Sequence, residues 1–206
     1  MRRILLAALV LLGAAFLLLR PASPGSAAPP GKLAAAIFAG GCFWCTEADF
    51  DKIPGVVSTV SGYAGGRVAN PSYEQVSAGG TGHIESVRVV YDPAKVSYQT
   101  LVARFFRTVD PLDGGGQFCD RGSQYRTAIF VAQAAERRVA EATKARAAAL
   151  LKKPIATLIL PAGPFYPAET YHQDYYRKNP VPYRYYRYRC GRDARLAQVW
   201  GKSAGH

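Results

Sequence analysis

Gly40-Gly41-Cys42-Phe43-Trp44-Cys45 is the stretch from which the fold and the chemistry of this 206-residue chain are best inferred. An apolar run at 33–39 precedes it and a helix-like stretch follows it. Two consecutive glycines let the backbone turn sharply at the end of a strand. Cys42 is then expected at the first turn of a helix, where unpaired backbone N–H groups and the helix dipole favour a thiolate. The two aromatic residues place a flat apolar surface beside that sulfur, which suits a methyl-bearing substrate.

Other interpretations of these cysteines stay open at this point. A cysteine outside a disulfide is often a small buried hydrophobic residue. The C-x-x-C spacing of Cys42 and Cys45 is also that of half a zinc site or of a thioredoxin-like dithiol. Spacing and position favour a reactive cysteine over a structural or metal-binding one.

The first 31 residues differ from the rest of the chain. Met1-Arg2-Arg3 is positively charged, 4–19 is uninterrupted apolar sequence, and 21–31 is a Pro/Ala/Ser/Gly linker. This layout is typical of a bacterial export signal, and the apolar run also allows an N-terminal membrane anchor. Residues 32–206 are then expected to form a single domain that is periplasmic, or anchored to the inner membrane and facing the periplasm, and a reactive cysteine would make this domain catalytic. Any contact with the membrane is expected only through the N-terminal segment.

The chain is basic, with a formal net charge of +12 at pH 7. Basic chains often bind nucleic acid, but no nucleic-acid motif accompanies this charge. A generally basic soluble domain, expected to be monomeric and without a nucleic-acid partner, is the simpler interpretation. Four cysteines in an exported protein suggest disulfides. A domain of this size does not need them for stability, so a redox-active pair is expected.

Strands and helices alternate after the linker. Strands are expected at 33–39, 56–63, 85–91, 125–132 and 155–160, and helices at 43–52, 98–109 and 134–151. This order resembles a split β-α-β sandwich, so we expect an α+β fold with a ferredoxin-like β-α-β-β-α-β core and an extra helix and strand. The C-terminal tail at 161–206 is too irregular to predict a strand, and we expect it to wrap over the domain. Two long loops, at 65–82 and 110–124, are candidate binding loops.

Glu85 is a candidate general acid. The period of two along the strand at 85–91 places it on the same face as Val87 and Val89. A carboxyl group on an apolar face loses solvent, which raises its pKa and keeps it protonated near neutral pH. The alternative is that Glu85 begins the strand and reaches water.

Five stretches together resemble one known family, the peptide methionine sulfoxide reductases of the A type. The stretches, in family order, are Ala39-Gly-Gly-Cys-Phe-Trp-Cys45, Asn70-Pro-Ser-Tyr-Glu-Gln-Val76, Thr81-Gly-His-Ile-Glu-Ser-Val87, Asp120-Arg-Gly-Ser-Gln-Tyr-Arg126 and Tyr171-His-Gln-Asp-Tyr-Tyr-Arg-Lys-Asn-Pro180. The resemblance runs from about residue 35 to residue 191. It implies a two-layer α/β sandwich around a mixed sheet, which agrees with the element order above.

The resemblance also implies the reaction and its residues. Cys42 is the expected nucleophile, which attacks the sulfur of methionine S-sulfoxide and becomes a sulfenic acid as methionine leaves. Glu85 is expected to bind and protonate the sulfoxide oxygen, with the hydroxyls of Tyr73 and Tyr125 holding that oxygen. Asp120 is expected to orient substrate or water. This division of labour is chemically sensible, because the oxygen is a poor leaving group until it is protonated.

Substrate recognition and reducing power follow from the same resemblance. Phe43 and Trp44 are the expected pocket for the terminal methyl group, which only shape and apolar area can recognise. No metal and no bound cofactor are expected. The reductant is expected to be an external thioredoxin-like dithiol, and the biological task the repair of oxidised exported proteins.

The remaining cysteines leave the recycling step open. Cys45 could resolve the sulfenic acid directly, and Cys190 resembles the recycling cysteine that many relatives carry near the C-terminus. We favour Cys190, because a helical C-x-x-C must also keep its two aromatic residues in the methyl pocket. Cys119 is expected near the site or in a plain packing role.

Two rival functions are worth separating from this hypothesis. One is a thioredoxin-like disulfide oxidoreductase built on Cys42 and Cys45, although the element order is wrong for it. The other is a basic module that binds polyanions through the Tyr/Arg-rich stretch 183–189, which we expect instead to pack on the domain. His83 and His172 are expected in structural roles, since the spacing of histidines and cysteines predicts no zinc site.

Overall fold

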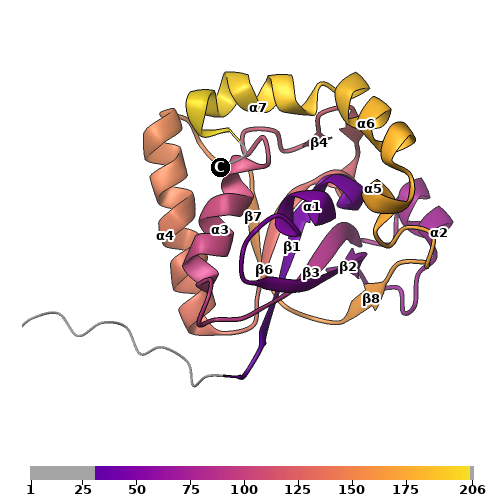
Figure 1. Ribbon diagram of the computed structural model, residues 1–206, viewed down its shortest axis with the longest axis horizontal. Coiled ribbons are helices and arrows are strands. Elements are labelled where there is room, and N and C mark those ends of the chain that lie inside the picture. The colour runs from indigo at the N-terminus through magenta and orange to yellow at the C-terminus, as the bar shows by residue number, and fades with distance from the viewer. Residues whose placement is uncertain (1–30, 205–206) are drawn as a thin grey trace, which may run out of the picture.

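The computed structural model describes residues 31–204, and its centre is a six-stranded sheet (Figure 1). The strand order is β7-β6-β1-β3-β2-β8. These strands are β1 (Ala34–Gly40), β2 (Val56–Ala64), β3 (Ile84–Tyr91), β6 (Thr127–Val131), β7 (Leu158–Pro161) and β8 (Phe165–Pro167). Two short strands, β4 (Gly116–Gln117) and β5 (Asp120–Arg121), pair separately with each other.

The sheet is mixed, as expected from the resemblance. β1 pairs antiparallel with both β3 and β6, and β2 pairs antiparallel with β3 and β8. β7 alone runs parallel to its neighbour, β6. An antiparallel set β6-β1-β3-β2 thus forms the centre, with β7 and β8 added at its two edges. The α+β class with a mixed sheet is confirmed.

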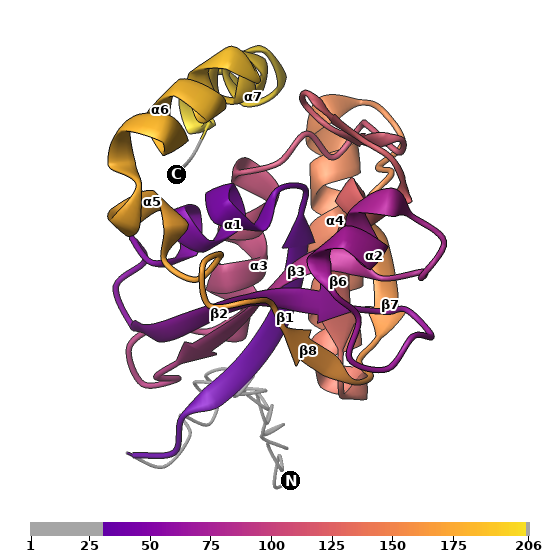
Figure 2. The same cartoon turned by 90° about the vertical axis from the view of Figure 1, so that its right-hand side faces the viewer.

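Helices cover one face of this sheet and form the second layer. The helices are α1 (Phe43–Phe50), α2 (Tyr73–Ala78), α3 (Tyr98–Arg107), α4 (Ala134–Leu151), α5 (Tyr175–Lys178), α6 (Pro180–Arg189) and α7 (Arg192–Trp200). Figures 1 and 2 show α1, α3 and α4 beside the sheet and α5, α6 and α7 as an arm that passes over α1. The start of α1 therefore lies between the sheet and this C-terminal arm.

The main core lies between the sheet and its helices. Phe38 of β1 is completely buried and packs its ring against those of Phe50 and Phe105, from α1 and α3 (centroid distances 4.7 and 5.3 Å). Alternation along β1 and β6 sends Ala39 and Phe130 to the opposite face, where a smaller cluster forms from strand residues. The period of two that predicted the strands is thus what divides the side chains between the two faces.

The C-terminal tail differs from the sequence prediction. We expected it to be too irregular for a strand, but Phe165–Pro167 pairs with β2 and extends the sheet. Beyond β8 the tail is largely helical. The Pro-rich start at 180–182 is compatible with a helix because Pro180 occupies its first position, where its missing N–H costs no hydrogen bond.

The two long loops contain short elements that periodicity did not reveal. α2 lies in the first loop and begins at Ser72, whose side chain and that of Gln75 form a reciprocal capping box. The second loop contains β4 and β5. Tyr125 was expected to begin a strand, but it ends a short 3₁₀ helix (Ser123–Tyr125), and β6 begins two residues later. The other predicted strands and helices agree with the structure to within about three residues at either end.

The N-terminal segment predicted as an export signal or anchor falls almost entirely at 1–30, outside the described residues. Among residues 31–204, no helix combines the length and the apolar character needed to cross a membrane.

Candidate active site

Cys42 lies at the turn between β1 and α1, as the sequence predicts. Gly41 has a φ of +82°, and a Cβ added there would lie 2.5 Å from Cβ of Gln117, so only glycine fits this turn. Cys42 is the N-cap residue of α1, and its carbonyl accepts the first hydrogen bonds of the helix from the N–H groups of Cys45 and Thr46 (both 3.2 Å). Its side chain is 6% exposed. The sulfur therefore lies at the positive end of a helix, inside the protein.

Glu85 faces the start of the same helix. It lies on the core-facing side of β3 with Val87, and 3% of its surface is exposed. One of its oxygens, Oε2, accepts the backbone N–H of Phe43 (3.0 Å). Burial, only partly opposed by this hydrogen bond, raises the pKa of Glu85 to about 8. The interpretation of Glu85 as a buried acid is confirmed, and the alternative of a carboxylate that reaches water is wrong.

A cavity of about 290 Å³ brings the predicted site residues together. Its walls are formed by Cys42, Phe43, Trp44, Tyr73, Glu85, Asp120, Tyr125 and Tyr186. All seven residues predicted for catalysis and methyl recognition lie in this set. They come from α1, β3, the two long loops and their short elements, so the fold joins segments that are far apart in the sequence.

The aromatic wall of the cavity is fixed by the C-terminal arm. Trp44 stacks on Tyr175 (ring centroids 3.8 Å apart, 9° between planes) and donates its Nε1–H to Nδ1 of His172 (3.0 Å). The His172 ring also lies 5.0 Å from that of Phe43. Burial lowers the pKa of His172, which keeps the ring neutral and able to accept this bond. His172 thus has the structural role expected of it, and that role is to orient Trp44.

Two phenols supply neutral donors to the cavity. Tyr73 begins α2, and its backbone N–H is held by Oε1 of Glu169 (2.8 Å). Tyr125 ends the 3₁₀ helix on the other side. Burial is the main cause that raises the pKa of both tyrosines, and the charge of Glu85 adds to it. Both hydroxyls therefore remain protonated and can donate hydrogen bonds.

The cysteine pair behaves differently from the sequence prediction. We expected the helix terminus to favour a Cys42 thiolate, but burial raises the pKa of Cys42 well above its ordinary value, and Cys45 and Glu85 add to this. The hydrogen bond from Cys42 lowers the pKa of Cys45 to about 7, and the positive charges of Arg192 and Arg187 also favour its thiolate. In the resting site Cys42 is thus a thiol, and Cys45 is the cysteine whose thiolate is favoured.

Two arginines of the C-terminal arm explain the positive field behind α1. Arg192 is 2% exposed and donates to the carbonyls of Gly40 (3.3 Å) and Thr108 (2.7 Å). Arg187 pairs with Asp49 on α1 at 3.0 Å. These contacts attach the arm to the turn that carries Cys42, and they leave one face of Cys45 near fixed cations.

Cys119 and Cys190 form a disulfide, while Cys42 and Cys45 remain thiols. As the favoured recycling residue, Cys190 would have to reach Cys42. Instead, Cys190 lines a separate hollow of about 570 Å³ with Asp110 and neighbouring residues, and it is absent from the walls of the Cys42 cavity. The tail contributes Tyr186 to the cavity in its place.

One group of potential metal ligands occurs among the described residues, namely Cys119, Asp120 and Cys190. Because its two sulfurs are bonded to each other, neither is the thiolate that a metal requires. His83 is occupied structurally, since its Nδ1 accepts the N–H of Gly66 (3.1 Å) and its Nε2 lies 2.7 Å from the Val68 carbonyl. The cavity chemistry is that of a thiol, a carboxylic acid and phenols.

The family's sequence model, Peptide methionine sulfoxide reductase, matches residues 34–204 of this chain. The chain belongs to the peptide methionine sulfoxide reductase A family. Peptide methionine sulfoxide reductase MsrA 2 of Caulobacter vibrioides is 52% identical over 202 residues, covering 98% of this chain and 100% of the relative.

Two solved structures of the family agree with the fold. Methionine sulfoxide reductase A of Corynebacterium diphtheriae is 39% identical with a TM-score of 0.65, covering 74% of this chain and 77% of that one. Mxr1 from Saccharomyces cerevisiae, in complex with Trx2, is 25% identical with a TM-score of 0.51, and the match covers 71% of this chain and 87% of that one.

Family membership makes the chain a peptide-methionine (S)-S-oxide reductase and decides against the thioredoxin-like oxidoreductase built on the same cysteines. The resemblance seen in the five sequence stretches is therefore confirmed. The sequence did not indicate Tyr186, because it lies in a run of tyrosines and arginines without a usable period.

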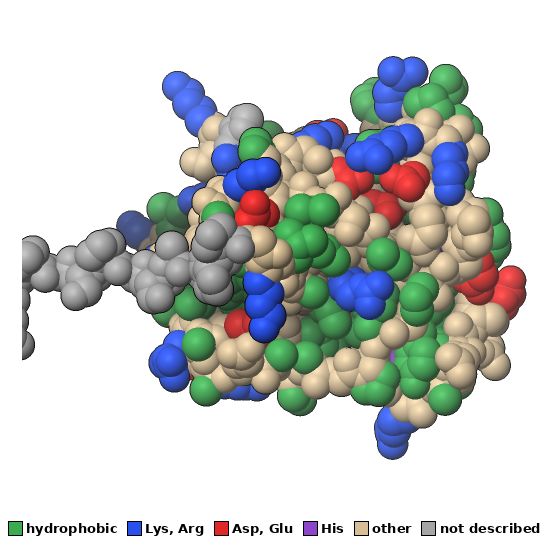
Figure 3. All heavy atoms as spheres, turned by 60° about the horizontal axis from the view of Figure 1, so that its bottom comes forward, with side chains coloured by type: hydrophobic (Ala, Val, Ile, Leu, Met, Phe, Trp, Pro, Cys, Tyr) green, Lys and Arg blue, Asp and Glu red, His purple; other side chains and the backbone are tan. Residues whose placement is uncertain are grey.

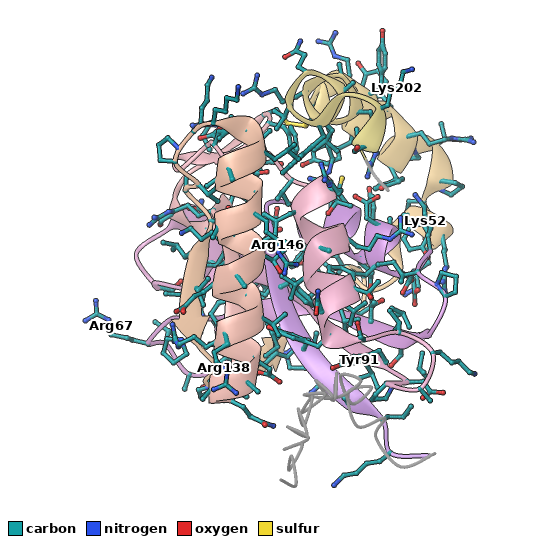
Figure 4. All side chains as sticks on the ribbon, turned by 90° about the vertical axis from the view of Figure 1, so that its left-hand side faces the viewer. Lys52, Arg67, Tyr91, Arg138, Arg146 and Lys202 are labelled. Carbon is teal, nitrogen blue, oxygen red and sulfur yellow. A yellow bond between two sulfur atoms is a disulfide. The ribbon has the colours of Figure 1, made fainter. Side chains whose placement is uncertain are left out.

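The surface gives the polyanion-binding alternative little support. Figure 3 shows Lys and Arg side chains dispersed over one face among acidic, polar and apolar ones. The labelled cations in Figure 4 are spread over the molecule, with Arg138 and Arg146 at different heights on α4 and Lys52, Arg67 and Lys202 on other segments. In the Tyr/Arg-rich stretch, Tyr183 is buried and Arg187 is paired with Asp49, as expected for a tail packed on the domain.

Proposed function

We propose that Cys42 reduces methionine S-sulfoxide inside this cavity, with Glu85 as the general acid and Phe43 and Trp44 as the methyl-binding wall. The observation that supports this most directly is the convergence on one cavity of a thiol, a carboxylic acid whose pKa is about 8 and two neutral phenols. A sulfoxide needs these groups together, because attack at sulfur and protonation of oxygen must coincide.

The first step transfers the oxygen to the enzyme. Cys42 loses its proton and attacks as a thiolate, so that its sulfur forms a bond to the sulfoxide sulfur while Glu85 gives its own proton to the sulfoxide oxygen. The hydroxyls of Tyr73 and Tyr125 act as further hydrogen-bond donors. Oxygen then passes to Cys42, which becomes a sulfenic acid, and methionine leaves. Asp120, beside these groups, would orient the substrate or water. Because Glu85 is buried, it enters this step in the protonated form that the step requires.

The stereochemistry of the substrate is the most direct test. Hydroxyl donors on one side and an aromatic wall on the other allow only one arrangement of oxygen and methyl around a tetrahedral sulfur. With dithiothreitol as reductant, we expect turnover of the S epimer of methionine sulfoxide, and turnover of the R epimer lower by more than about 100-fold. Separated epimers, assayed by chromatography of the methionine formed, give the result. Equal turnover of both epimers would contradict this geometry.

Cys45, rather than Cys190, is the residue that we propose resolves the sulfenic acid. Cys45 lies one helical turn from Cys42 and is a free thiol, while Cys190 is bonded to Cys119. Attack of the Cys45 thiolate on the Cys42 sulfenic sulfur breaks the S–O bond and forms the disulfide, and the hydroxide that leaves takes up a proton from solvent to become water. The positive charges of Arg192 and Arg187, which favour the charged form of Cys45, support its thiolate in this attack.

Replacing Cys45 by serine should separate the two halves of the reaction. We expect Cys45→Ser to release one methionine per chain, with a first-turnover rate of the same order of magnitude as that of the parent. Recycling with a thioredoxin-like dithiol should then be about 10- to 100-fold slower, because the sulfenic acid must wait for an external thiol. Rapid-quench measurement of the first turnover, followed by steady-state turnover, distinguishes these steps. Cys190→Ser is the matched control, and a loss of recycling in that variant instead would restore the original preference for Cys190.

The reductant that we propose is a thioredoxin-like dithiol. The yeast relative named above has been solved in complex with Trx2. In this exchange a donor thiolate attacks the Cys42–Cys45 disulfide and forms a mixed disulfide. The second thiol of the donor then resolves the mixed disulfide, which leaves Cys42 and Cys45 reduced and the donor oxidised, so no further co-reactant is needed. The donor available to this chain depends on its compartment.

Export would make oxidised proteins outside the cytoplasm the substrates. The N-terminal residues 1–31 support this proposal through their positive start, apolar run and small-residue linker. Fusing 1–31 to a reporter enzyme that is active only outside the cytoplasm should give activity at least about tenfold above a matched fusion in which the apolar run at 4–19 is interrupted by two aspartates. Equal activity of the two fusions would place the substrates in the cytoplasm.

A further inference from the structure

The Cys119–Cys190 disulfide joins two segments that lie far apart in the sequence. Cys119 directly precedes β5 in the second long loop, and Cys190 ends α6; 71 residues separate them, and their Cα atoms lie 4.8 Å apart. Cys119 is exposed and Cys190 half-buried. Figure 4 draws the disulfide as a yellow bond beside the C-terminal helices. Neither sulfur has a part in the steps assigned above.

The cross-link lies next to a pair of interacting polar residues. Asp120 follows Cys119 in the chain, and Tyr186 precedes Cys190 by one helical turn, with the Cys190 N–H donating to the Tyr186 carbonyl (2.9 Å). Residues four apart lie on the same face of a helix, so Tyr186 and Cys190 both face the second long loop. There the Tyr186 hydroxyl donates to Oδ2 of Asp120. The disulfide and this hydrogen bond thus hold the same two segments together, namely the second long loop and α6.

Tyr186 also faces the nucleophile. It lines the cavity with Cys42, and its ring meets Trp44 edge-on, with centroids 5.7 Å apart. A hydrogen bond from the Tyr186 hydroxyl lowers the pKa of Cys42, in opposition to the burial that raises it. Burial, followed by the charges of Cys42 and Asp120, raises the pKa of Tyr186, so its hydroxyl remains a donor. A hydroxyl has one proton, which can turn from Asp120 to Cys42 when the thiolate forms.

We propose that the Cys119–Cys190 disulfide is a clamp that positions the Tyr186 hydroxyl to stabilise the Cys42 thiolate, with Asp120 as the second anchor. The proposal rests on the nucleophilic role assigned to Cys42. It gives a positioning role to two cysteines that recycling through Cys45 leaves unused. It also explains how a buried thiol becomes reactive, since the Tyr186 hydroxyl lines the cavity with Cys42 and its hydrogen bond favours the Cys42 thiolate.

The arrangement argues for a clamp instead of a second set of redox residues. Cys190 lines the separate hollow beside Asp110, and neither Cys119 nor Cys190 lines the cavity of Cys42. α6 keeps its own attachment to α1 through Arg187 and Asp49 (3.0 Å). Loss of the disulfide should therefore loosen Tyr186 without releasing the whole arm.

The test measures alkylation of Cys42 by iodoacetamide as a function of pH in a Cys45→Ser background. Cys42 is then the sole thiol of the chain while the disulfide is intact. Tyr186→Phe should slow alkylation at pH 7 about tenfold and raise the pH at which it is half-maximal, because a charge-assisted hydrogen bond is lost. The pair Cys119→Ser with Cys190→Ser should slow alkylation about threefold, since Tyr186 then occupies its position only part of the time.

Non-additivity decides the proposal. Adding the two serines to Tyr186→Phe should cause no further slowing, because the clamp acts only through the Tyr186 hydroxyl. Tyr185→Phe, an exposed neighbour in the same helix, is the matched control and should change nothing. The clamp would be overturned if the effects of Tyr186→Phe and of the serine pair on the alkylation rate multiplied. It would also be overturned if the serine pair had the same pH profile of alkylation as the parent. If the serine pair does not fold, Asp120→Ala replaces it, with the same non-additivity expected.

A count of electrons provides a second test in the full chain. After complete reduction of its four cysteines and removal of the reductant, the protein should form one methionine per chain, with electrons from Cys42 and Cys45 alone. Two methionines per chain would show that Cys119 and Cys190 pass electrons to the site, which overturns the clamp. The alkylation assay contains no sulfoxide, so a failure of the proposed reaction and a failure of the clamp give different results.

Discussion

Cys42→Ser is expected to lower kcat/KM for methionine S-sulfoxide on the order of 10⁴-fold or more, the largest effect of any single substitution in this chain. A serine hydroxyl is far less acidic and less polarisable than a thiol, and it cannot attack sulfur under these conditions. It also cannot accept the oxygen to form a sulfenic acid. The cavity itself should remain intact, since the two side chains are similar in size and Cys42 makes no side-chain capping bond to its helix.

A single-turnover experiment measures this effect without interference from recycling. Reduced protein is mixed with the S epimer in the absence of reductant, and the methionine released per chain is counted. The parent and the Cys45→Ser variant should each release one methionine, whereas Cys42→Ser should release none. Release of one methionine by Cys42→Ser would transfer the nucleophilic role to Cys45, which the lowered pKa of Cys45 makes the natural competitor.

The site could be predicted well where one local pattern determines position. The Gly-Gly pair before Cys42 requires a tight turn, and the alternation along β3 places Glu85 on the core-facing side. Because burial follows from that alternation, even the raised pKa of Glu85 could be predicted in direction. Sequence reasoning succeeded here because position, burial and chemistry all depend on a few neighbouring residues.

Features that depend on contacts between distant segments could not be predicted. The pKa of Cys42 is raised mainly by burial and then by Cys45, and burial at a helix start depends on the arm that covers it. Tyr186 reaches the cavity from α6, and the disulfide pairs residues 71 positions apart. β8 is only three residues long, too short to show a period of two.

Glu85→Gln should give the second-largest effect, lowering kcat/KM about 10²- to 10⁴-fold, the range expected when a general acid is lost. Glutamine keeps the shape of the side chain and can still accept the Phe43 N–H with its carbonyl oxygen. It can donate a hydrogen bond to the sulfoxide oxygen but cannot release a proton to it. The loss should therefore fall on kcat more than on KM, which separates proton transfer from substrate binding.

The pH dependence of the parent enzyme should reveal the same group. Glu85 has a pKa of about 8 in the folded protein, above its ordinary value of 4.5, so it is protonated and active below pH 8. As pH rises through 8, the proton is lost and kcat/KM should fall tenfold per pH unit. The unfolded chain loses this proton near its ordinary pKa, so Glu85 also makes the stability of the fold decrease as pH rises from about 4.5 to about 8. Glu85→Gln should remove both slopes.

Glu47→Gln is the control that distinguishes the acid of the cavity from a buried acid elsewhere. Glu47 lies on α1, is 1% exposed, and has a pKa raised to about 7, mainly by burial. Its oxygen accepts the N–H of Asp174 (3.0 Å), and it does not line the cavity. Its replacement should change how the stability of the fold depends on pH, and it should leave the fall in kcat/KM near pH 8 in place. If that fall persists in Glu85→Gln, or disappears in Glu47→Gln, Glu85 is not the proton donor.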